Sequence, residues 1–409
     1  MTEFAFRSLA SDAEISPWLD HVVECFADKG TPRSYFERHW AMDPFRSLKG
    51  IRIATEQSTL SAAALPLTNG VIASSVRIYD RRVSLHGRVL GVGGIGEVST
   101  KKAFRGKGLA SALMNDALEY MKREGIPLAA LHTSNPLTVA FYAKLGWISV
   151  PLYFYELSID RQLLASAPKT QFDICAVPIA NPTSNQSFDA TEWHDIAQLH
   201  AHAVSTFSGS FVRLKHPEAS IDADNAEYWR TWIAAEALER HTTYVLALYP
   251  ATSAHQPNEK QPLLAYGIFH VRIHPKTQTA LLVHARDFIV RSDASTDVSV
   301  LLALANEAAS LWYGSHHQEP LPTVIVKVQQ GLLQTNAASF PSLVQNLESI
   351  VDPGYMYKVV DGCAVANALR RPDLAVDSLE GVAMIEQQLA ALMTSGNPQQ
   401  HIFLEMDAY

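Results

Sequence analysis

The feature that most restricts the fold is a change of hydrophobic period near residue 100. Residues 94–100 are typical of a strand, because they include the β-branched residues Ile95, Val98 and Thr100. The apolar residues that follow recur at i, i+3, i+4, i+7, i+8 and i+11, which predicts an amphipathic helix. They are Ala110, Leu113, Met114, Ala117, Leu118 and Met121. Lys122 and Arg123 suit the last turn of this helix, and Gly125 predicts its end.

The rest of the first 158 residues alternates between strand and helix patterns in the same way. Expected strands are Glu3–Leu9, Ile51–Thr55, Val71–Tyr79, Arg82–Leu85, Pro127–Thr133 and Trp147–Leu157. Expected helices are Ala13–Ala27, Pro32–Trp40 and Leu137–Leu145. A tight connection is expected at Tyr79-Asp80-Arg81. Alternating elements of this kind predict an α/β fold.

The second half partly repeats this order. Helices are expected at Thr191–Phe207 and Val298–Tyr313, and a C-terminal helix between Ser378 and Gly396. Strands are expected at Tyr244–Tyr249, Leu263–Ile273, Ala280–Val290, Thr323–Val328 and Tyr355–Val360. We therefore predict two tandem copies of the fold, in residues 1–158 and 191–365. A linker at 159–190 joins them, and a helix and tail follow at 366–409.

Composition narrows the class of protein. The 409 residues are 47% hydrophobic and 18% charged, which is typical of a folded chain. No long uncharged apolar stretch occurs, so we expect no membrane segment and a cytoplasmic location. The three cysteines, Cys25, Cys175 and Cys363, are too scattered for disulfides or a metal site, and we expect them to be buried. The net charge of −8 argues against nucleic acid as a partner.

The charge is divided unevenly along the chain. Residues 1–150 hold 18 Lys and Arg against 14 Asp and Glu, so they are net positive, whereas the remainder is strongly acidic. A polyanionic small ligand would therefore prefer the first part.

The turn before the best helix has the composition of an anion site. It contains Arg105, Gly106, Lys107 and Gly108, followed by Leu109 and Ala110. Main-chain N–H groups at a helix start have no carbonyl partner, and the helix dipole adds positive charge there. Phosphate oxygens suit such a turn. A solvated basic turn capped by water is the other interpretation.

These residues carry a resemblance. Arg105-Gly106-Lys107-Gly108-Leu109-Ala110 resembles the Q/R-x-x-G-x-G/A signature of the GNAT superfamily of acyl-CoA-dependent N-acyltransferases. Downstream, Asn135, Tyr142, Gly146 and Trp147 resemble the family's N-x5-L-Y-x3-G-F signature, with Phe141 in place of Leu and Trp147 in place of Phe. The resemblance covers residues 1–158 and implies a mixed twisted sheet with flanking helices. It also implies acetyl-CoA as the acyl donor. It implies that the main chain of Val98, Ser99 and Thr100 pairs with the pantetheine arm.

The resemblance also implies direct attack of an amine on the thioester. Tyr142 occupies the position of the family's proton donor to the leaving thiolate, although it could simply pack there. Since an amine must lose its proton to react, we expect a base. Glu97 is the first candidate because it is the acid on the strand that enters the loop, although a structural ion pair is equally compatible. His132 is the second candidate, and the terminal carboxylate of Tyr409 a third.

Asn135 is expected to bind the pantetheine amides or to cap a helix before Pro136. Residues 91–96 match the dinucleotide-binding pattern G-x-G-x-x-G, but a strand follows them where that pattern requires a helix. We therefore interpret them as a loose start of that strand, with a bulge as one option, and not as a dinucleotide site. The corresponding turn of the second copy, 291–297, lacks paired glycines and holds two acids, which predicts degenerate cofactor binding. No metal is expected, because HExxH is missing and the histidines lack ligand spacing.

The sequence thus predicts an acetyl-CoA-dependent N-acetyltransferase acting on a primary amine, either a small molecule or a lysine side chain. The acidic second half favours a cationic acceptor. The alternative is a noncatalytic CoA-binding or scaffolding protein of the same fold.

Overall fold

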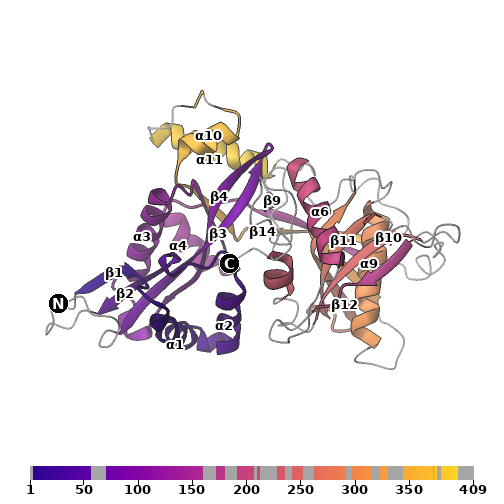
Figure 1. Ribbon diagram of the computed structural model, residues 1–409, viewed down its shortest axis with the longest axis horizontal. Helices are drawn as coiled ribbons and strands as arrows, with labels where there is room; N and C mark the ends of the chain where they lie inside the picture. The colour runs from indigo at the N-terminus through magenta and orange to yellow at the C-terminus, as the bar shows by residue number, and fades with distance from the viewer. Residues whose placement is uncertain are drawn as a thin grey trace.

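The chain folds around two β-sheets that lie side by side (Figure 1). The computed structural model describes residues 3–56, 71–159, 172–179, 191–206, 210–211, 228–234, 242–251, 262–291, 297–314, 323–329, 344–371, 373–374 and 379–394. Both sheets carry helices, and two further helices follow near the C-terminal end of this part. The predicted α/β class, with two tandem copies and a C-terminal helical segment, is confirmed.

The first sheet has the order β1-β2-β3-β4-β5-β15-β6, and the short β9 pairs with β3. All neighbours are antiparallel except the parallel pair β4–β5. The strands are β1 Phe4–Ser8, β2 Ile51–Glu56, β3 Ile72–Leu85, β4 Arg88–Thr100, β5 Leu128–His132, β6 Ile148–Ser149, β9 Ser210–Phe211 and β15 Tyr355–Val359.

Helices cover both faces of this sheet. Side chains of β2 contact helices on both faces because successive side chains of a strand point to opposite sides. Ile51 and Ile53 pack with the buried side chains of Trp18 and Phe36, which lie on α1 and α2. Arg52 faces the other way and binds Asp116 of α3 through two hydrogen bonds. The helices are α1 Ile15–Phe26, α2 Arg33–Met42, α3 Leu109–Arg123 and α4 Pro136–Lys144.

The second sheet has the order β14-β7-β13-β12-β11-β10-β8, with β12–β13 as its parallel pair. Its strands are β7 Leu152–Ile159, β8 Phe172–Ala176, β10 Thr243–Pro250, β11 Ala265–Ile273, β12 Ala280–Val290, β13 Thr323–Gln329 and β14 Val344–Asp352. Helix α9 (Asp297–Gly314) packs on this sheet through fully buried side chains such as Leu301 and Leu304. Helix α6 (Thr191–Thr206) and the single π-helical turn η5 (Trp229–Ile233) complete the core.

The two sheets exchange strands. β6 lies in the first sheet, and β7, which follows it directly, lies in the second. β14 and β15 cross in the opposite direction. The predicted single strand Trp147–Leu157 is therefore wrong, because the chain leaves the first sheet at Val150 and Pro151, and proline cannot donate a ladder hydrogen bond. The predicted strand at 355–360 exists, but it completes the first sheet rather than the second.

Three further expectations differ from the structure. β3 runs unbroken through Tyr79-Asp80-Arg81, and the reversal occurs instead at His86 and Gly87, which both have positive φ. β8 falls inside the predicted linker at 159–190, and most of that linker lies outside the described residues. The end of the predicted tail, 395–409, and most of the second-copy turn, 292–296, also lie outside them. Cys175 and Cys363 are exposed and Cys25 is half-buried, so their predicted burial is wrong. No described helix is long and apolar enough to cross a membrane.

The C-terminal helices α10 (Gly362–Ala368) and α11 (Leu379–Thr394) pack beside the β3–β4 hairpin (Figure 1). Val83 and Leu85 of the hairpin share a buried cluster with Val365 and Ile385. This contact fixes the far end of the hairpin whose opposite end borders the site described next.

Candidate active site

The parallel strands β4 and β5 separate before they end. They pair from Val92 opposite Leu128 to Gly94 opposite Ala130. Beyond this point β4 continues to Thr100 and remains paired with β3 on its other edge, as far as Ser74 opposite Thr100. The edge of β4 that faces β5 therefore has no strand partner over its last residues, and its main-chain groups there can bind a ligand.

A β-bulge turns Glu97 toward this opening. Glu97 and Val98 together face the single residue Val76 of β3, and Glu97 has a φ of 52°. The bulge interrupts the alternation of side chains along β4. The direction of the Glu97 side chain therefore could not be predicted from the sequence. The Tyr79 hydroxyl donates a hydrogen bond of 2.9 Å to Glu97 Oε1, and Arg77 lies 3.4 Å from the same oxygen. The predicted ion pair of Glu97 is therefore present, and the role of Glu97 as a base stays a prediction.

The carboxylate of Glu97 is almost wholly covered. Its side chain is 7% exposed. Oε2 is buried and has no hydrogen-bond partner among the described residues. A buried carboxylate oxygen without a donor is unfavourable, so this atom is suited to receive a proton or an N–H group from a ligand.

Two buried arginines lie behind Glu97. Asp43 binds Arg77 at 3.1 Å and Arg81 at 3.0 Å, and all three side chains are nearly inaccessible. Burial opposes ionisation of Asp43, but the Arg81 and Arg77 guanidinium groups outweigh it and hold the pKa of Asp43 below its usual value. Burial raises the pKa of Tyr79 well above its ordinary value, so its hydroxyl remains a donor to Glu97.

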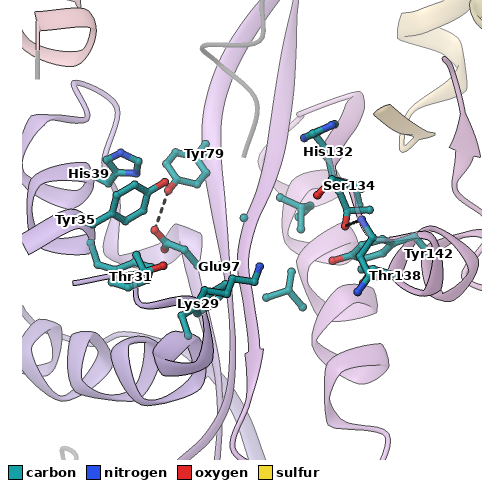
Figure 2. A pocket seen from close by; sticks show the side chains of 18 of the residues that line it. Lys29, Thr31, Tyr35, His39, Tyr79, Glu97, His132, Ser134, Thr138 and Tyr142 are labelled. Atoms are coloured by element: carbon teal, nitrogen blue, oxygen red, sulfur yellow. Dashed lines mark hydrogen bonds between the residues drawn. The ribbon is translucent and has the colours of Figure 1, made fainter. Parts of the chain in front are cut away.

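Tyr79 and Glu97 line a cleft of about 800 Å³. Figure 2 shows Tyr35, His39, Tyr79 and Glu97 on one wall, with His132, Thr138 and Tyr142 across from them. Trp232 and Arg286 from the second half of the chain also line it. The structure thus brings together Glu97, Val98, His132, Asn135 and Tyr142 from the predicted set.

Tyr142 lies on α4 and is 6% exposed. Burial raises the pKa of its phenol to about 12, so the group is protonated at neutral pH. A protonated phenol in the wall of the cleft is suited to donate a proton. Asn135 caps the same helix, because its Oδ1 accepts a 3.0 Å hydrogen bond from the N–H of Leu137. Its predicted contact with the cofactor stays a prediction.

His132 lies at the end of β5 beside the exchanged strands. Its Nε2 is 3.2 Å from Oδ2 of Asp352, and its ring is 4.3 Å from that of Tyr355. Sequence reasoning missed both partners. No local signal could have found them, because they become neighbours of His132 only through the strand exchange.

The turn before α3 leaves its amides open. Gly106 and Gly108 have φ values of 77° and 76°, and the turn is exposed. Within the described residues, no acceptor pairs with the main-chain N–H of Gly106, Lys107 or Gly108. Arg105 directs its Nε to the carbonyl of Thr100 at 3.2 Å. This arrangement fits a diphosphate, which takes hydrogen bonds from bare amides and attraction from nearby cations.

The other predicted cofactor residues are Ser99, Thr100, Leu109 and Ala110, and their binding of a cofactor stays a prediction. Leu109 is the first residue of α3 and its side chain is buried in the core. Ala110 follows it in the first turn of that helix. Ser99 Oγ is 3.0 Å from Nε2 of His21, and Thr100 Oγ1 is 2.8 Å from Ser74 Oγ. The side chains of β4 at this point are therefore tied to the protein.

His21 is a buried residue that sequence reasoning did not single out. Its Nδ1 faces the carbonyl of Ile72 at 3.1 Å and its Nε2 faces Ser99. Burial, together with the charge of Lys101, lowers the pKa of His21 to about 4, so the ring is neutral at pH 7. His21 thus stabilises the end of β4 from beneath. No group of three or more potential metal-ligating side chains occurs in the described part of the chain.

The comparisons with known proteins agree with this geometry. A family model described as an acetyltransferase (GNAT) domain matches residues 6–149. A search of curated proteins found no significant match to the sequence. The fold is similar to a crystal structure of a GCN5-related N-acetyltransferase from Anabaena variabilis, with a TM-score of 0.56 and 14% identity over 90% of this chain and 75% of that one.

Two other solved structures have a similar fold. One is a probable N-acyltransferase from Enterococcus faecalis, with a TM-score of 0.56 and 16% identity over 88% of this chain and 73% of that one. The other is Eis1 from Mycobacterium abscessus, with a TM-score of 0.51 and 14% identity over 90% of this chain and 76% of that one. Residues 6–149 thus match the acetyltransferase (GNAT) domain family, and the overall fold of the chain is similar to that of GCN5-related N-acetyltransferase structures.

Proposed function

We propose that the protein is an N-acetyltransferase that moves an acetyl group from acetyl-CoA to a primary amine in a ternary complex, in the cytoplasm. The observation that carries this proposal is the separation of β4 from β5, which leaves one strand edge open between the turn at 105–108 and the cleft that holds Glu97 and Tyr142. A thioester held along that edge would end beside both side chains.

Each part of the site has a separate role in binding the donor. The bare amides of Gly106, Lys107 and Gly108 bind the diphosphate, and Arg105 adds positive charge. The N–H groups of Val98–Thr100 on the strand edge that faces away from β3 orient the pantetheine arm. The same N–H groups stabilise the charge that develops on the carbonyl oxygen.

Two side chains move protons. The amine nitrogen bonds to the acetyl carbon while the bond from that carbon to sulfur breaks. Glu97 takes the proton that the amine loses, and Tyr142 donates a proton to the departing sulfur. His132 is the second candidate for the base, and Asp352 would then hold its ring in place. Tyr409 lies outside the described residues.

The test is CoA thiol release from acetyl-CoA in the presence of a panel of primary amines. The turn is tested separately by thermal protection, since a ligand that binds the folded state raises the melting temperature. We expect Arg105→Glu and Gly108→Asp to abolish protection by CoA.

Matched controls lie at the other end of the same helix. Lys122→Glu reverses an exposed charge, and Gly125→Asp places the same side chain at a glycine with a φ of 69° and open space around it. Both controls should keep CoA protection. Protection that survives Arg105→Glu and Gly108→Asp would remove the turn from the proposal. Protection by CoA without thiol release from any amine would instead support a noncatalytic CoA-binding protein.

A further inference from the structure

One wall of the cleft is built from aromatic rings of both halves of the chain. Tyr35 and His39 of α2 have ring centroids 4.0 Å apart, and His39 is 5.3 Å from Trp232 of η5. Trp232 in turn lies 6.0 Å from Tyr79 of β3. Tyr35, His39, Tyr79 and Trp232 all line the cleft, and we call these four residues the aromatic wall.

The rings of the aromatic wall already interact with cations from behind. The guanidinium carbon of Arg77 is 4.0 Å from the centre of the Tyr79 ring. That of Arg81 is 4.8 Å from the centre of the Trp232 ring. A buried guanidinium draws on the same π-electron density that an ammonium group in the cleft would need. The wall is therefore better suited to an uncharged planar group than to a second cation.

The carboxylates of the cleft limit how many ammonium groups it can hold. Among the described lining residues, Glu97 is the one acid, whereas Lys29 and Arg286 bring positive charge to the lining. Each ammonium group withdrawn from water needs a partner of opposite charge. Among the described lining residues, a polyamine or an aminoglycoside would find a carboxylate for one of its amino groups.

Glu97 defines where that single amino group would bind. Its Oε1 accepts from Tyr79, and its Oε2 is buried without a partner in the described structure. Tyr79 belongs to the aromatic wall, so a nitrogen at Oε2 would place its substituent against the rings. Figure 2 shows Glu97 beside Tyr79 and Tyr35 on this wall.

We propose that the acceptor is a monoamine with a planar aromatic group, whose nitrogen binds at Glu97 and whose ring packs on the aromatic wall. This substrate class rests on the proposed acetyl transfer. It narrows the sequence-based expectation of a cationic acceptor to one with a single ammonium group, because the acidic second half contributes Trp232 and Arg286 to the described lining and no carboxylate.

The test compares four probes in the thiol-release assay: phenethylamine, phenylalanine, ethylamine and spermidine. We expect one of the two aromatic amines to exceed both ethylamine and spermidine at least about tenfold in kcat/KM. Preference for phenethylamine identifies an arylalkylamine, and preference for phenylalanine identifies an aromatic amino acid. Spermidine or ethylamine as the best acceptor would overturn the proposal.

Substitutions in the aromatic wall test where the ring of the acceptor binds. Tyr35→Ala removes a half-buried ring and should raise the KM for the preferred aromatic amine about tenfold while changing that for ethylamine less than twofold. Trp232→Phe, which keeps an aromatic core side chain, is the second variant and should act in the same direction. Tyr153→Ala removes a ring that is 37% exposed outside the cleft, and should change neither constant. An equal rise for both amines would contradict the assigned position of the ring.

Calorimetric titration separates this inference from the proposed function. Phenethylamine and phenylalanine are titrated into the CoA-saturated protein. Binding that is weakened by Tyr35→Ala, together with no thiol release, would reject acetyl transfer and keep the ligand class. Binding of neither aromatic probe would reject the ligand class whatever the thiol assay shows.

Discussion

The imidazole Nε2 of His132 lies 3.2 Å from Oδ2 of Asp352, a residue 220 positions further along the chain. The pair exists because β15 lies next to β5, with Tyr355 opposite His132. Asp352 is itself held in place, since its Oδ1 accepts a hydrogen bond of 2.9 Å from the N–H of Gly354. A carboxylate fixed in this way selects one tautomer of the histidine and restrains the rotation of its ring.

The His132–Asp352 contact yields the first prediction. If His132 accepts the proton of the amine, Asp352→Asn should lower kcat about tenfold and change KM for acetyl-CoA little, because only the orientation of the base is disturbed. Steady-state kinetics with the preferred amine would measure this. Glu348→Gln changes an exposed acid on the same strand and is the control. An unchanged kcat for Asp352→Asn would leave Glu97 as the base.

A second prediction concerns Glu97 itself. Glu97→Gln keeps the shape of the side chain and the acceptor for Tyr79 but removes the capacity to take a proton. We expect kcat to fall about a hundredfold at pH 7 and to recover in part at higher pH, where more of the amine is already neutral. The measurement is a kcat profile from pH 7 to 10. A profile parallel to that of the wild type would rule out Glu97 as the base.

The buried phenol of Tyr142 gives a third prediction. Tyr142→Phe should lower kcat about a hundredfold and leave the Kd of CoA within twofold, since only the proton donor is removed. The pKa of Tyr142 is raised to about 12, so its protonated form persists well above pH 10 and its ionisation should not limit activity below that pH. Tyr153→Phe is a matched control outside the cleft. An unchanged kcat for Tyr142→Phe would show that Tyr142 only packs there.

A fourth prediction concerns stability and pH. The pKa of His21 is lowered to about 4, so the unfolded chain binds a proton at higher pH than the folded protein does. The stability that neutral His21 provides is present above pH 6.5 and is lost as the pH falls toward 4, by about 3 kcal/mol.

Urea denaturation at pH 7.5 and pH 4.5 would measure this loss. His21→Gln should lower the free energy of unfolding at pH 7.5, because hydrogen bonds to Ile72 and Ser99 change. It should also reduce the difference between the two pH values. His202→Gln, at an exposed histidine, should behave as the wild type. A His21→Gln protein with the same pH dependence as the wild type would contradict the assignment.

The parts of the fold that could be predicted from sequence are those encoded locally. α3 follows from apolar residues at helical spacing, and its start and end follow from Gly108 and Gly125, whose positive φ values suit glycine. The turn at 105–108 and Tyr142 on α4 depend on the same short-range signals. Their arrangement around one cleft follows from the order of the strands.

The parts that could not be predicted depend on distant partners. A break is expected at Tyr79-Asp80-Arg81, yet β3 continues there, and Arg81 is buried with Arg77 because Asp43 and Glu97 neutralise the two arginines. The apolar pattern of β15 would suit a strand of either sheet, so it does not indicate which sheet this strand joins. Asp352 therefore could not be assigned to the site. The position of Trp232 in the aromatic wall could not be predicted for the same reason.

The strand exchange also has a consequence for how the protein is made. The ribosome synthesises the turn at 105–108 and Tyr142 early, but the strand that lies between β5 and β6 ends only at Val359. Lys358 of that strand donates hydrogen bonds to the carbonyls of Leu145 and Gly146 at the end of α4, the helix that carries Tyr142. A nascent chain therefore reaches a complete first sheet only after residue 359 has been synthesised, which keeps the proposed chemistry silent until β15 has emerged.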